Sequence, residues 1–435
     1  MSIIITFIDC VITSFYLKQY RLYINKLRRR IIVDLSKKQS TFALLALAIS
    51  AFAIGTTEFI SVGLLPLIAN DLQVSVTTAG LTVSLYALGV TFGAPILTSI
   101  TSSMSRKHLL LWIMVIFIIG NSIAAFSTSI GMLLVARVIS AFSHGIFMSI
   151  GSTIAADLVP ENRRASAISI MFTGLTVATV TGVPLGTFIG QQFGWRMAFI
   201  IIVGIGIIAF IANSILVPSN LRKGTRTTFR NQFKLVTNGR LLLLFTITIS
   251  GYGGTFVVFT YLSPILQEIT GFKEGTVAAI LLLYGIAIAI GNTVGGKLSN
   301  HNPIRALFYM FIVQAVILFF LMFTAPFKIA GLITIFLMGA LAFMNVPGLQ
   351  VYAVMLAERF VPSGVDVASA INIAAFNAGI ALGSYLGGII TDSIGLIHTT
   401  WVGALMVLIA AFLAGWSTIF ERKDQKASKL NRAVS

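Results

Sequence analysis

The sequence predicts an all-α polytopic membrane protein, with twelve transmembrane helices in two pseudo-repeated six-helix halves. Three observations carry this prediction. The chain is 57% hydrophobic and only 10% charged, with a mean hydropathy of +0.96, whereas about a quarter of the residues in a soluble domain are charged. Its apolar stretches are long enough to cross a membrane, and its basic residues collect between alternate stretches. An internal repeat divides the chain into halves.

A transmembrane helix needs about 20 predominantly apolar residues to cross a hydrocarbon core of about 30 Å. Twelve stretches meet that requirement, and they lie at about 42–65, 78–100, 109–127, 130–155, 165–190, 197–217, 241–266, 275–297, 304–325, 328–356, 365–390 and 399–418.

The net charge of +17 follows from topology rather than from a nucleic-acid surface. If both termini are cytoplasmic, 26 of the 30 Lys and Arg residues fall on the cytoplasmic side. Such an excess is the positive-inside signal of a membrane protein. We therefore expect both termini in the cytoplasm, lipid around the helices, no bound nucleic acid and a monomeric protein.

Residues 1–40 form an N-terminal extension that we expect in the cytoplasm. Its apolar part, Met1 to Leu17, precedes the basic segment "KQYRLYINKLRRR", which is the wrong order for a signal peptide. An interfacial helix and a dispensable or mis-started extension both remain open, and we assign this segment no function. The single cysteine, Cys10, excludes an internal disulfide and a CxxC pair, and we expect no metal or cofactor.

The first span contains "GTTEFISVG", in which Glu58 is the only charged residue between Phe42 and Leu65. On a 3.6-residue helix Phe52, Phe59 and Ile60 point away from Glu58 and are expected to face lipid. The face of Glu58 itself is small and polar, and it holds Ala51, Gly55, Ser61 and Val62. Intramembrane ionisable groups usually face the bundle interior and mark an ion path, so we interpret Glu58 as a proton carrier. A structural glutamate held by a hydrogen bond is the alternative.

Arg137 in the fourth span is expected to meet Glu58. Each residue lies seven positions from the outer end of its span, or roughly 10 Å at 1.5 Å per residue, and a buried charge strongly prefers a partner. Arg137 is therefore a proton-coupling candidate, with a static brace between helices as the alternative. His144 lies two turns further along the same face and is a weaker candidate, because a lone membrane histidine is more often a packing residue.

Span five carries Gly182, Gly186 and Gly190 on one face, where they allow another helix to approach closely. Pro184 removes a backbone hydrogen bond and permits a bend. Packing explains this pattern, and a hinge or seal for alternating access is its functional interpretation.

The basic stretch 218–240 separates six spans from six and is expected to be a cytoplasmic linker. A repeat appears across it, because "GVPLGTFIG" at 182 aligns with "GIALGSYLG" at 379. The predicted division is an extension at 1–40, a first half at 41–217, the linker, a second half at 241–420 and a cytoplasmic tail at 421–435. Two homologous six-span halves are typical of a secondary transporter, whose site lies near the membrane midplane.

These residues resemble the major facilitator superfamily. The segment "GLTVATVTGVPLGTFIGQQFGW" is similar to the antiporter motif of its twelve-span drug:proton antiporter branch. "GTTEFISVGLLPLIANDL", "YALGVTFGAPILTSITSSMSRK" and "RVISAFSHGIF" resemble the bacterial sugar, ribonucleoside and chloramphenicol exporters within that branch. The resemblance covers residues 41–420 and implies a protein of the bacterial cytoplasmic membrane.

Two family motifs are incomplete in this chain. The loop after the second span keeps Gly93, Arg106 and Lys107 but lacks the acid and the first arginine of the superfamily pattern, so its charge-relay role does not carry over intact. In the fourth span Arg137 is present, whereas Ala141 occupies the first glycine position of the motif.

Together these features predict a proton-coupled antiporter that exports a small organic molecule by alternating access. An importing proton symporter or facilitator of the same fold is the alternative. An enzyme is not expected, because the four histidines are scattered and no HExxH motif is present. The substrate stays open between a drug, a nucleoside and a sugar. The candidate substrate-binding residues are Phe256, Phe259, Tyr261, Asn345, Gln350, Asn372, Phe376 and Asn377.

Overall fold

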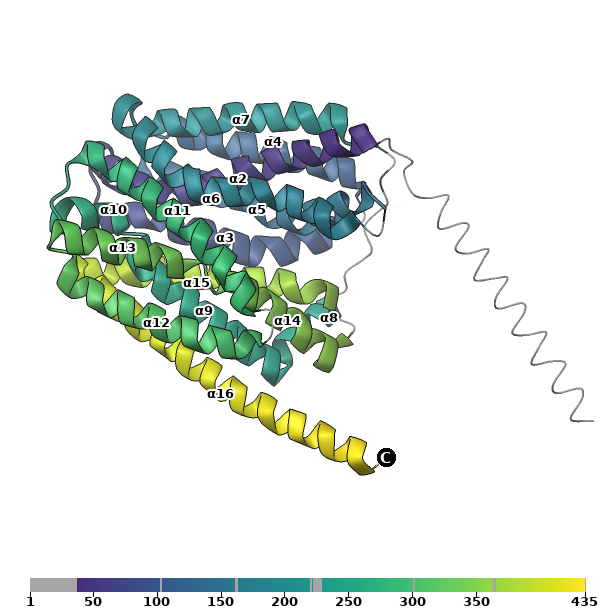
Figure 1. Ribbon diagram of the computed structural model, residues 1–435. Coiled ribbons are helices and arrows are strands. Elements are labelled where there is room, and N and C mark those ends of the chain that lie inside the picture. Colours follow the sequence, from purple (N-terminus) through teal and green to yellow (C-terminus); the bar gives the residue numbers. More distant parts are fainter. Residues whose placement is uncertain are drawn as a thin grey trace, which may run out of the picture.

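The protein is an all-helical bundle whose helices run side by side, as the computed structural model shows (Figure 1). The structure describes residues 37–101, 104–160, 163–219, 221, 229–299, 302–362 and 365–434. Twelve helical segments in these residues are long and apolar enough to span a membrane. The expectations for the extension before residue 37 and for linker residues 222–228 fall outside the described residues.

The first six spans are single helices: α2 (Lys37–Asp71), α3 (Val76–Thr101), α4 (Arg106–Ala125), α5 (Ile130–Asp157), α6 (Arg164–Phe193) and α7 (Trp195–Leu216). The short helix α8 (Phe229–Thr237) leads to the remaining six spans. Two of these spans are composite: the seventh consists of α9 (Gly239–Phe259), α10 (Leu262–Pro264) and the π-helix η2 (Ile265–Ile269), and the tenth consists of α13 (Lys328–Ala342) and α14 (Val346–Phe360). The others are α11 (Glu274–Ser299), α12 (Pro303–Thr324), α15 (Val365–Ser393) and α16 (Thr399–Val434), which follows the short η4 (Leu396–His398).

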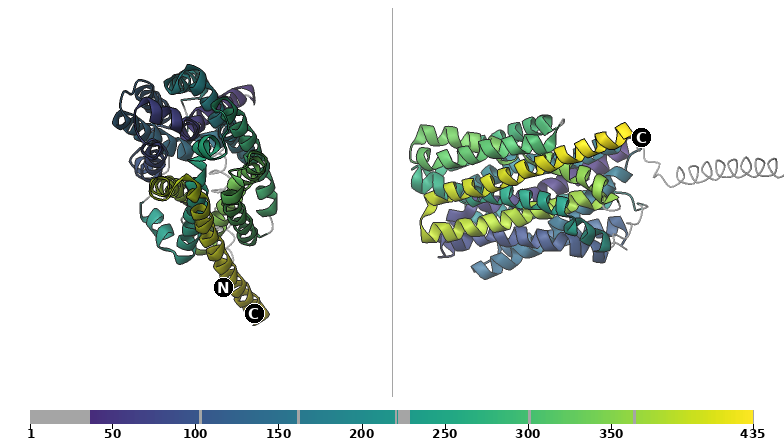
Figure 2. Two further views of the ribbon diagram at one scale, coloured as in Figure 1. Left: turned by 90° about the vertical axis from the view of Figure 1, so that its left-hand side faces the viewer. Right: turned by 90° about the horizontal axis from the view of Figure 1, so that it is seen from below.

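The helices pack as two sets with the same internal arrangement. In the N-terminal set (α2–α7), α2 packs on α6, α3 on α5 and α4 on α7. In the C-terminal set (α9–α16), the corresponding pairs are α9 with α15, α11 with α13 and α14, and α12 with α16. The views along and below the helices show the sets lying beside each other (Figure 2). The repeat in the sequence is therefore also a repeat of helix packing.

The sets meet mainly where α3 contacts α15 and where α6 contacts α11. We call the end of the bundle that holds Asp71 and Val76 the distal end, and the end that holds Lys37 and α8 the linker end. Among the described residues, three hydrogen bonds between the sets lie at the distal end, and a longer one joins Thr91 to the Ala374 carbonyl at 3.4 Å nearer the linker end. At the distal end, the Thr77 hydroxyl lies 2.7 Å from Asp392 Oδ1 and 3.2 Å from the Gly388 carbonyl, and Gln191 donates to the carbonyl of Glu274 at 2.6 Å. We call this group of bonds the distal seal.

Two spans that the sequence predicts as continuous are interrupted. The seventh span breaks after Phe259, because Pro264 has no N–H for the carbonyl four residues earlier, and the chain continues as a turn and a π-helix. The tenth span breaks at residues 343–345 between α13 and α14, next to Pro347. Each break lies in the C-terminal set.

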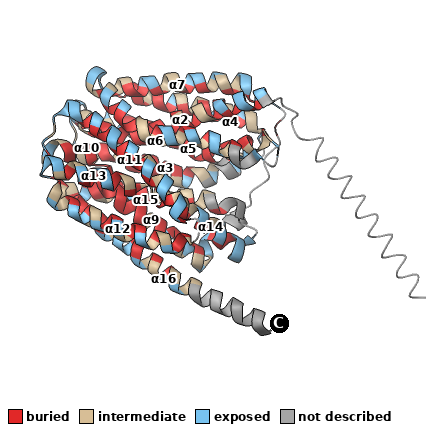
Figure 3. Cartoon of the chain, in the orientation of Figure 1, coloured by how far each residue is buried: buried red, intermediate tan, exposed pale blue. Residues whose placement is uncertain are grey.

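Each helix buries the side chains that face the bundle interior and exposes those that face outward. Exposed large apolar side chains lie on the outward sides, whereas the inward sides are buried (Figure 3). This distribution suits helices that are surrounded by lipid, because lipid rather than water covers the apolar outer surface.

Candidate functional site

Glu58 lies near the middle of α2 without a polar partner for its carboxylate. Its neighbours Thr57 and Phe59 are buried, whereas Glu58 is only partly buried. Within the described part of the chain, the carboxylate makes no hydrogen bond or ion pair. An ionised carboxylate left in this way in a bundle interior is costly, so the site favours either a proton or a ligand on Glu58.

Arg137 on α5 meets Glu58, as the matched depths predict, but through the backbone. The guanidinium is 1% exposed. It donates from Nη1 to the Thr57 carbonyl at 2.6 Å, from Nη2 to the Glu58 carbonyl at 3.3 Å and from Nε to the Thr82 carbonyl at 3.1 Å. Arg137 therefore binds α5 to α2 and α3, while its positive charge stays within electrostatic range of the Glu58 carboxylate.

Tyr86 on α3 contacts both Arg137 and His144, although it was not among the candidates. Its ring lies 4.1 Å from the guanidinium carbon of Arg137, an arrangement that allows a cation–π interaction. Its hydroxyl lies 3.2 Å from Nδ1 of the buried His144. No charge or spacing marks Tyr86 in the sequence, because its significance depends on which helix lies opposite.

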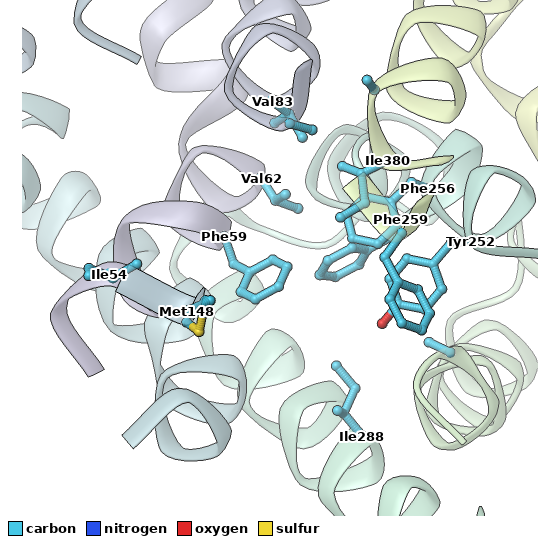
Figure 4. Close-up of a cluster of buried hydrophobic side chains, with 14 of the residues drawn as sticks. Ile54, Phe59, Val62, Val83, Met148, Tyr252, Phe256, Phe259, Ile288 and Ile380 are labelled. Atoms are coloured by element: carbon cyan, nitrogen blue, oxygen red, sulfur yellow. The ribbon is translucent and has the colours of Figure 1, made fainter. Parts of the chain in front are cut away.

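The prediction that Phe59 and Ile60 face lipid is wrong. Phe59 is 5% exposed and points at the other helix set, with its ring centroid 6.5 Å from that of Phe256 and 6.0 Å from that of Phe343 (Figure 4). Ile60 is buried against Gly186 of α6. The helical period correctly separates these residues from Glu58, but α2 is central in its set and is covered on several sides, so its large side chains also find protein.

Several of the candidate substrate-binding residues lie together in an aromatic cluster between the sets. Tyr252 is at its centre, with ring centroids at 5.7 Å from Phe256, 5.5 Å from Phe343 and 4.5 Å from Phe376. Phe259 extends the cluster by contacting Phe256 and stacking on Tyr284 at 5.1 Å. Tyr252, Phe343 and Tyr284 were not among the candidates.

The three candidate asparagines come from the chain segments that carry Phe343 and Phe376, and their hydrogen-bonding groups are incompletely used. Asn345 donates to Gln314 at 3.3 Å, and Asn372 accepts from Thr248 at 2.9 Å. Asn377 donates to a carbonyl of its own helix. One side-chain polar atom of each asparagine is buried without a hydrogen bond. Such atoms carry a desolvation cost of about 1–3 kcal/mol each until a partner arrives.

The other two candidates lie in different surroundings. Tyr261 lies beside the distal seal, where its hydroxyl donates to the Ser384 carbonyl at 3.1 Å and lies against Gly80 and Gly388. Gln350 is half-buried on α14, near the linker end of the C-terminal set.

The glycine face of α6 packs inside the N-terminal set. A Cβ added at Gly186 would lie 2.2 Å from Ile60, and one at Gly190 would lie 2.4 Å from Leu64. Gly182 approaches Thr56 in the same way. The close helix contact is therefore present, but these glycines do not form a hinge or seal between the sets, because their partner α2 belongs to the same set.

Pro184 contributes to the contact between the sets through the carbonyl that it leaves free. Because Pro184 has no N–H, the Val180 carbonyl lacks its usual helical partner. This carbonyl points at α11, where a Cβ added at Gly285 would lie 2.3 Å from the oxygen. Only glycine permits so close an approach.

The incomplete loop motif at the linker end has a local role in the N-terminal set. Arg106 forms an ion pair with Asp157 at the end of α5, and Lys107 donates to the Ser214 carbonyl of α7 at 2.7 Å. Across the described ranges, no three His, Cys, Asp or Glu side chains are grouped as a metal site would require.

Comparisons with known proteins give a consistent result. A family model described as "Major Facilitator Superfamily" matches residues 47–359. The chain is 79% identical over 391 residues to the uncharacterized MFS-type transporter YtbD of Bacillus subtilis, covering 90% of this chain and 99% of that protein. It is 36% identical over 373 residues to the inner membrane transport protein YdhP of Escherichia coli K12, covering 86% and 95%.

Two solved structures share the fold at low sequence identity. A bacterial homologue of the human lysosomal transporter Spinster, in an inward-facing and unoccupied conformation, superposes with a TM-score of 0.67 at 17% identity, covering 90% of this chain and 99% of that one. A D-xylose-proton symporter superposes with a TM-score of 0.70 at 14% identity, covering 86% and 97%.

Proposed function

The chain belongs to the Major Facilitator Superfamily and is a multi-pass membrane transporter, and we propose that it is a proton-coupled antiporter that exports a small organic molecule from the bacterial cytoplasm. The observation that carries this proposal is the carboxylate of Glu58, which is partly exposed in the bundle interior and has no polar partner among the described residues. A transporter that exchanges protons needs such a group, because a permanently paired carboxylate would not change its protonation state.

The proposed cycle alternates the surroundings of Glu58. Water access favours the ionised carboxylate, and burial without a hydrogen-bond donor favours the protonated one. Arg137 provides a fixed positive charge nearby, and its three backbone bonds keep it in place in either state. One proton crossing 100 mV yields about 2.3 kcal/mol, which supports about a fiftyfold substrate gradient at 1.36 kcal/mol per decade.

We assign the linker end to the cytoplasm, because the positive-inside pattern places most basic residues there. The distal seal then closes the outer side, and Glu58 communicates with the cytoplasmic side. Reporter fusions at Arg230 and at the C-terminus test this assignment, since both should report the cytoplasm.

We place the substrate between the sets, at the aromatic cluster and its neighbouring asparagines. Rings and unpaired amide atoms suit a small solute that stacks and forms hydrogen bonds. The guanidinium of Arg137 is unsuited to bind an anion directly, because three of its nitrogens already donate to carbonyls and its face covers Tyr86.

The decisive experiment uses protein reconstituted in liposomes with an imposed pH gradient. Ethidium, uridine and arabinose serve as probes of the drug, nucleoside and sugar classes. Wild-type protein should accumulate at least one probe against the proton flow, and Glu58→Gln should only equilibrate it. The matched control is Thr255→Ser, since Thr255 lies 197 residues after Glu58 in the repeat and serine keeps the hydroxyl that accepts from Gln314.

Other outcomes would contradict the proposal. Accumulation of a probe in the direction of proton flow would identify an importing symporter, and gradient-insensitive equilibration by wild-type protein would identify a facilitator. A Glu58→Gln variant that still builds a gradient from protons would show that this carboxylate is structural.

A further inference from the structure

Tyr252 on α9 faces Glu58 from the opposite helix set. The two residues are linked through rings, because Phe59 beside Glu58 contacts Phe256, and Phe256 stacks on Tyr252. Tyr252 also lies within electrostatic range of the Glu58 carboxylate. The side chains of Phe59 and Tyr252 approach from the two sides of the same cluster (Figure 4).

The ring of Tyr252 is fixed, but its hydroxyl is unused. Three rings hold it: Phe256, Phe343 and Phe376. Its hydroxyl has no hydrogen-bond partner among the residues that the structure describes. A phenol held in this way presents a donor in one defined direction at little conformational cost.

Within the described residues of its own set, Glu58 lies near no free ionisable or phenolic donor, and the unpaired hydroxyls there are the aliphatic ones of Thr56, Ser61 and Ser84. On α5, Arg137 donates to three backbone carbonyls, and the buried His144 pairs with the Tyr86 hydroxyl of α3. The described side chains of α6, which packs along α2, include no titratable group in the span. The free phenolic donor whose ring is linked to Phe59 through Phe256 is the Tyr252 hydroxyl, which belongs to the C-terminal set.

We propose that the Tyr252 hydroxyl donates a hydrogen bond to the ionised carboxylate of Glu58 when the two helix sets approach at the linker end. Tyr252 is then a positioning residue that connects the protonation of Glu58 with the closure of the sets. Its own proton stays on the phenol, and the proton released by Glu58 goes to water. This inference rests on the proposed role of Glu58 as the proton carrier.

The first test observes Glu58 directly, by infrared titration of purified protein without substrate. The carboxyl band that disappears in Glu58→Gln identifies the residue. A hydroxyl that donates to the ionised form favours that form, so in Tyr252→Phe the midpoint of this band should move to higher pH by about one unit. The ring and its packing stay intact in this variant.

Tyr284→Phe is the matched control. Tyr284 is also a phenol in the aromatic cluster, but its oxygen is sealed and without a partner, and the midpoint should stay unchanged. An unchanged midpoint in Tyr252→Phe, or an equal shift in both variants, overturns the proposal.

A double-mutant cycle separates this inference from the proposed function. The readout is the pH dependence of thermal unfolding of the purified protein, which requires no transport. Tyr252→Phe should alter that dependence in the wild-type background and leave it unchanged in Glu58→Gln, because the hydrogen bond needs a carboxylate. Equal effects in both backgrounds overturn the role of Tyr252. The proposed function is tested separately, because it fails if a proton gradient drives no transport into or out of the liposomes.

Discussion

The two helix sets have the same packing but different chemistry. α6 lays its glycine face on α2, and α15 lays its glycine face on α9. The ionisable residues Glu58, Arg137 and His144 all belong to the N-terminal set. The positions 197 residues later hold Thr255, Thr334 and Leu341. Helix packing and the ionisable side chains are therefore separable features, since the C-terminal set keeps the packing and has no ionisable residue at the equivalent positions.

The C-terminal set holds neutral polar groups where the N-terminal set holds charges. Thr255, at the position equivalent to Glu58, accepts from Gln314 at 2.6 Å, and Gln314 accepts from Asn345. Together with the aromatic cluster, these groups are suited to neutral recognition. In the proposed transport cycle, one set handles the proton and the other contributes most of the substrate contacts.

The largest expected effect tests whether the charged residues belong to one set alone. Arg137→Ala removes three bonds to carbonyls of α2 and α3, and we expect transport to disappear and the free energy of unfolding to fall by about 3 kcal/mol. Thr334→Ala should cost less than about 1 kcal/mol, because its hydroxyl bonds only to the Ala330 carbonyl of its own helix. Thermal unfolding in detergent measures both changes in stability. Similar losses of stability in the two variants would show that the two helix sets do not differ in this respect.

The next effect tests the shared packing. A Cβ at Gly383 would lie 2.0 Å from the backbone oxygen of Gly253, whereas a Cβ at Gly186 meets the side chain of Ile60. A backbone oxygen cannot move away without shifting its helix, whereas Ile60 can shift only slightly because it is buried and β-branched. Gly383→Ala should therefore cost about 2 kcal/mol and Gly186→Ala about 1 kcal/mol. Thermal unfolding in detergent measures both costs. A larger loss of stability in Gly186→Ala than in Gly383→Ala would contradict this prediction.

A smaller effect separates substrate recognition from proton handling. Asn372→Ala removes an amide whose nitrogen is unpaired in the structure, and we expect KM to rise about tenfold, since a hydrogen bond to substrate is worth about 1.4 kcal/mol. The pH dependence of transport should stay unchanged. Thr248→Val, which removes the partner of Asn372, controls for a purely structural effect. A shifted pH profile in Asn372→Ala would place proton handling in both sets.

The smallest effect concerns His144. Its Nδ1 pairs with the Tyr86 hydroxyl, and glutamine preserves a polar partner without carrying a proton. We expect His144→Gln to change the transport rate by no more than about twofold, the equivalent of less than 0.5 kcal/mol. Loss of proton-driven transport in this variant would indicate that His144 on α5, rather than Glu58 alone, carries the proton.

The sequence allowed the spans, the repeat and the meeting of Glu58 with Arg137 to be predicted, because hydrophobic length, residue spacing and depth are properties of the chain itself. It did not allow the partners of Arg137 to be predicted, since backbone carbonyls carry no residue identity. Phe59 was assigned to lipid because a helical period does not tell which helix lies opposite. Tyr86 and Tyr252 were missed for the same reason.

The distal seal sets how often the distal end opens. Its three hydrogen bonds join Thr77 to Asp392 and to the Gly388 carbonyl, and Gln191 to the Glu274 carbonyl. The Thr77 hydroxyl has one proton for its two acceptors, so the seal contains two donors. At a net value of about 1 kcal/mol for each donor, they favour the closed end by about 2 kcal/mol, which corresponds to an open population on the order of one molecule in thirty. Thermal motion visits such a minor state within microseconds to milliseconds. A ligand or a proton therefore only has to retain the open form, because spontaneous fluctuation already supplies it.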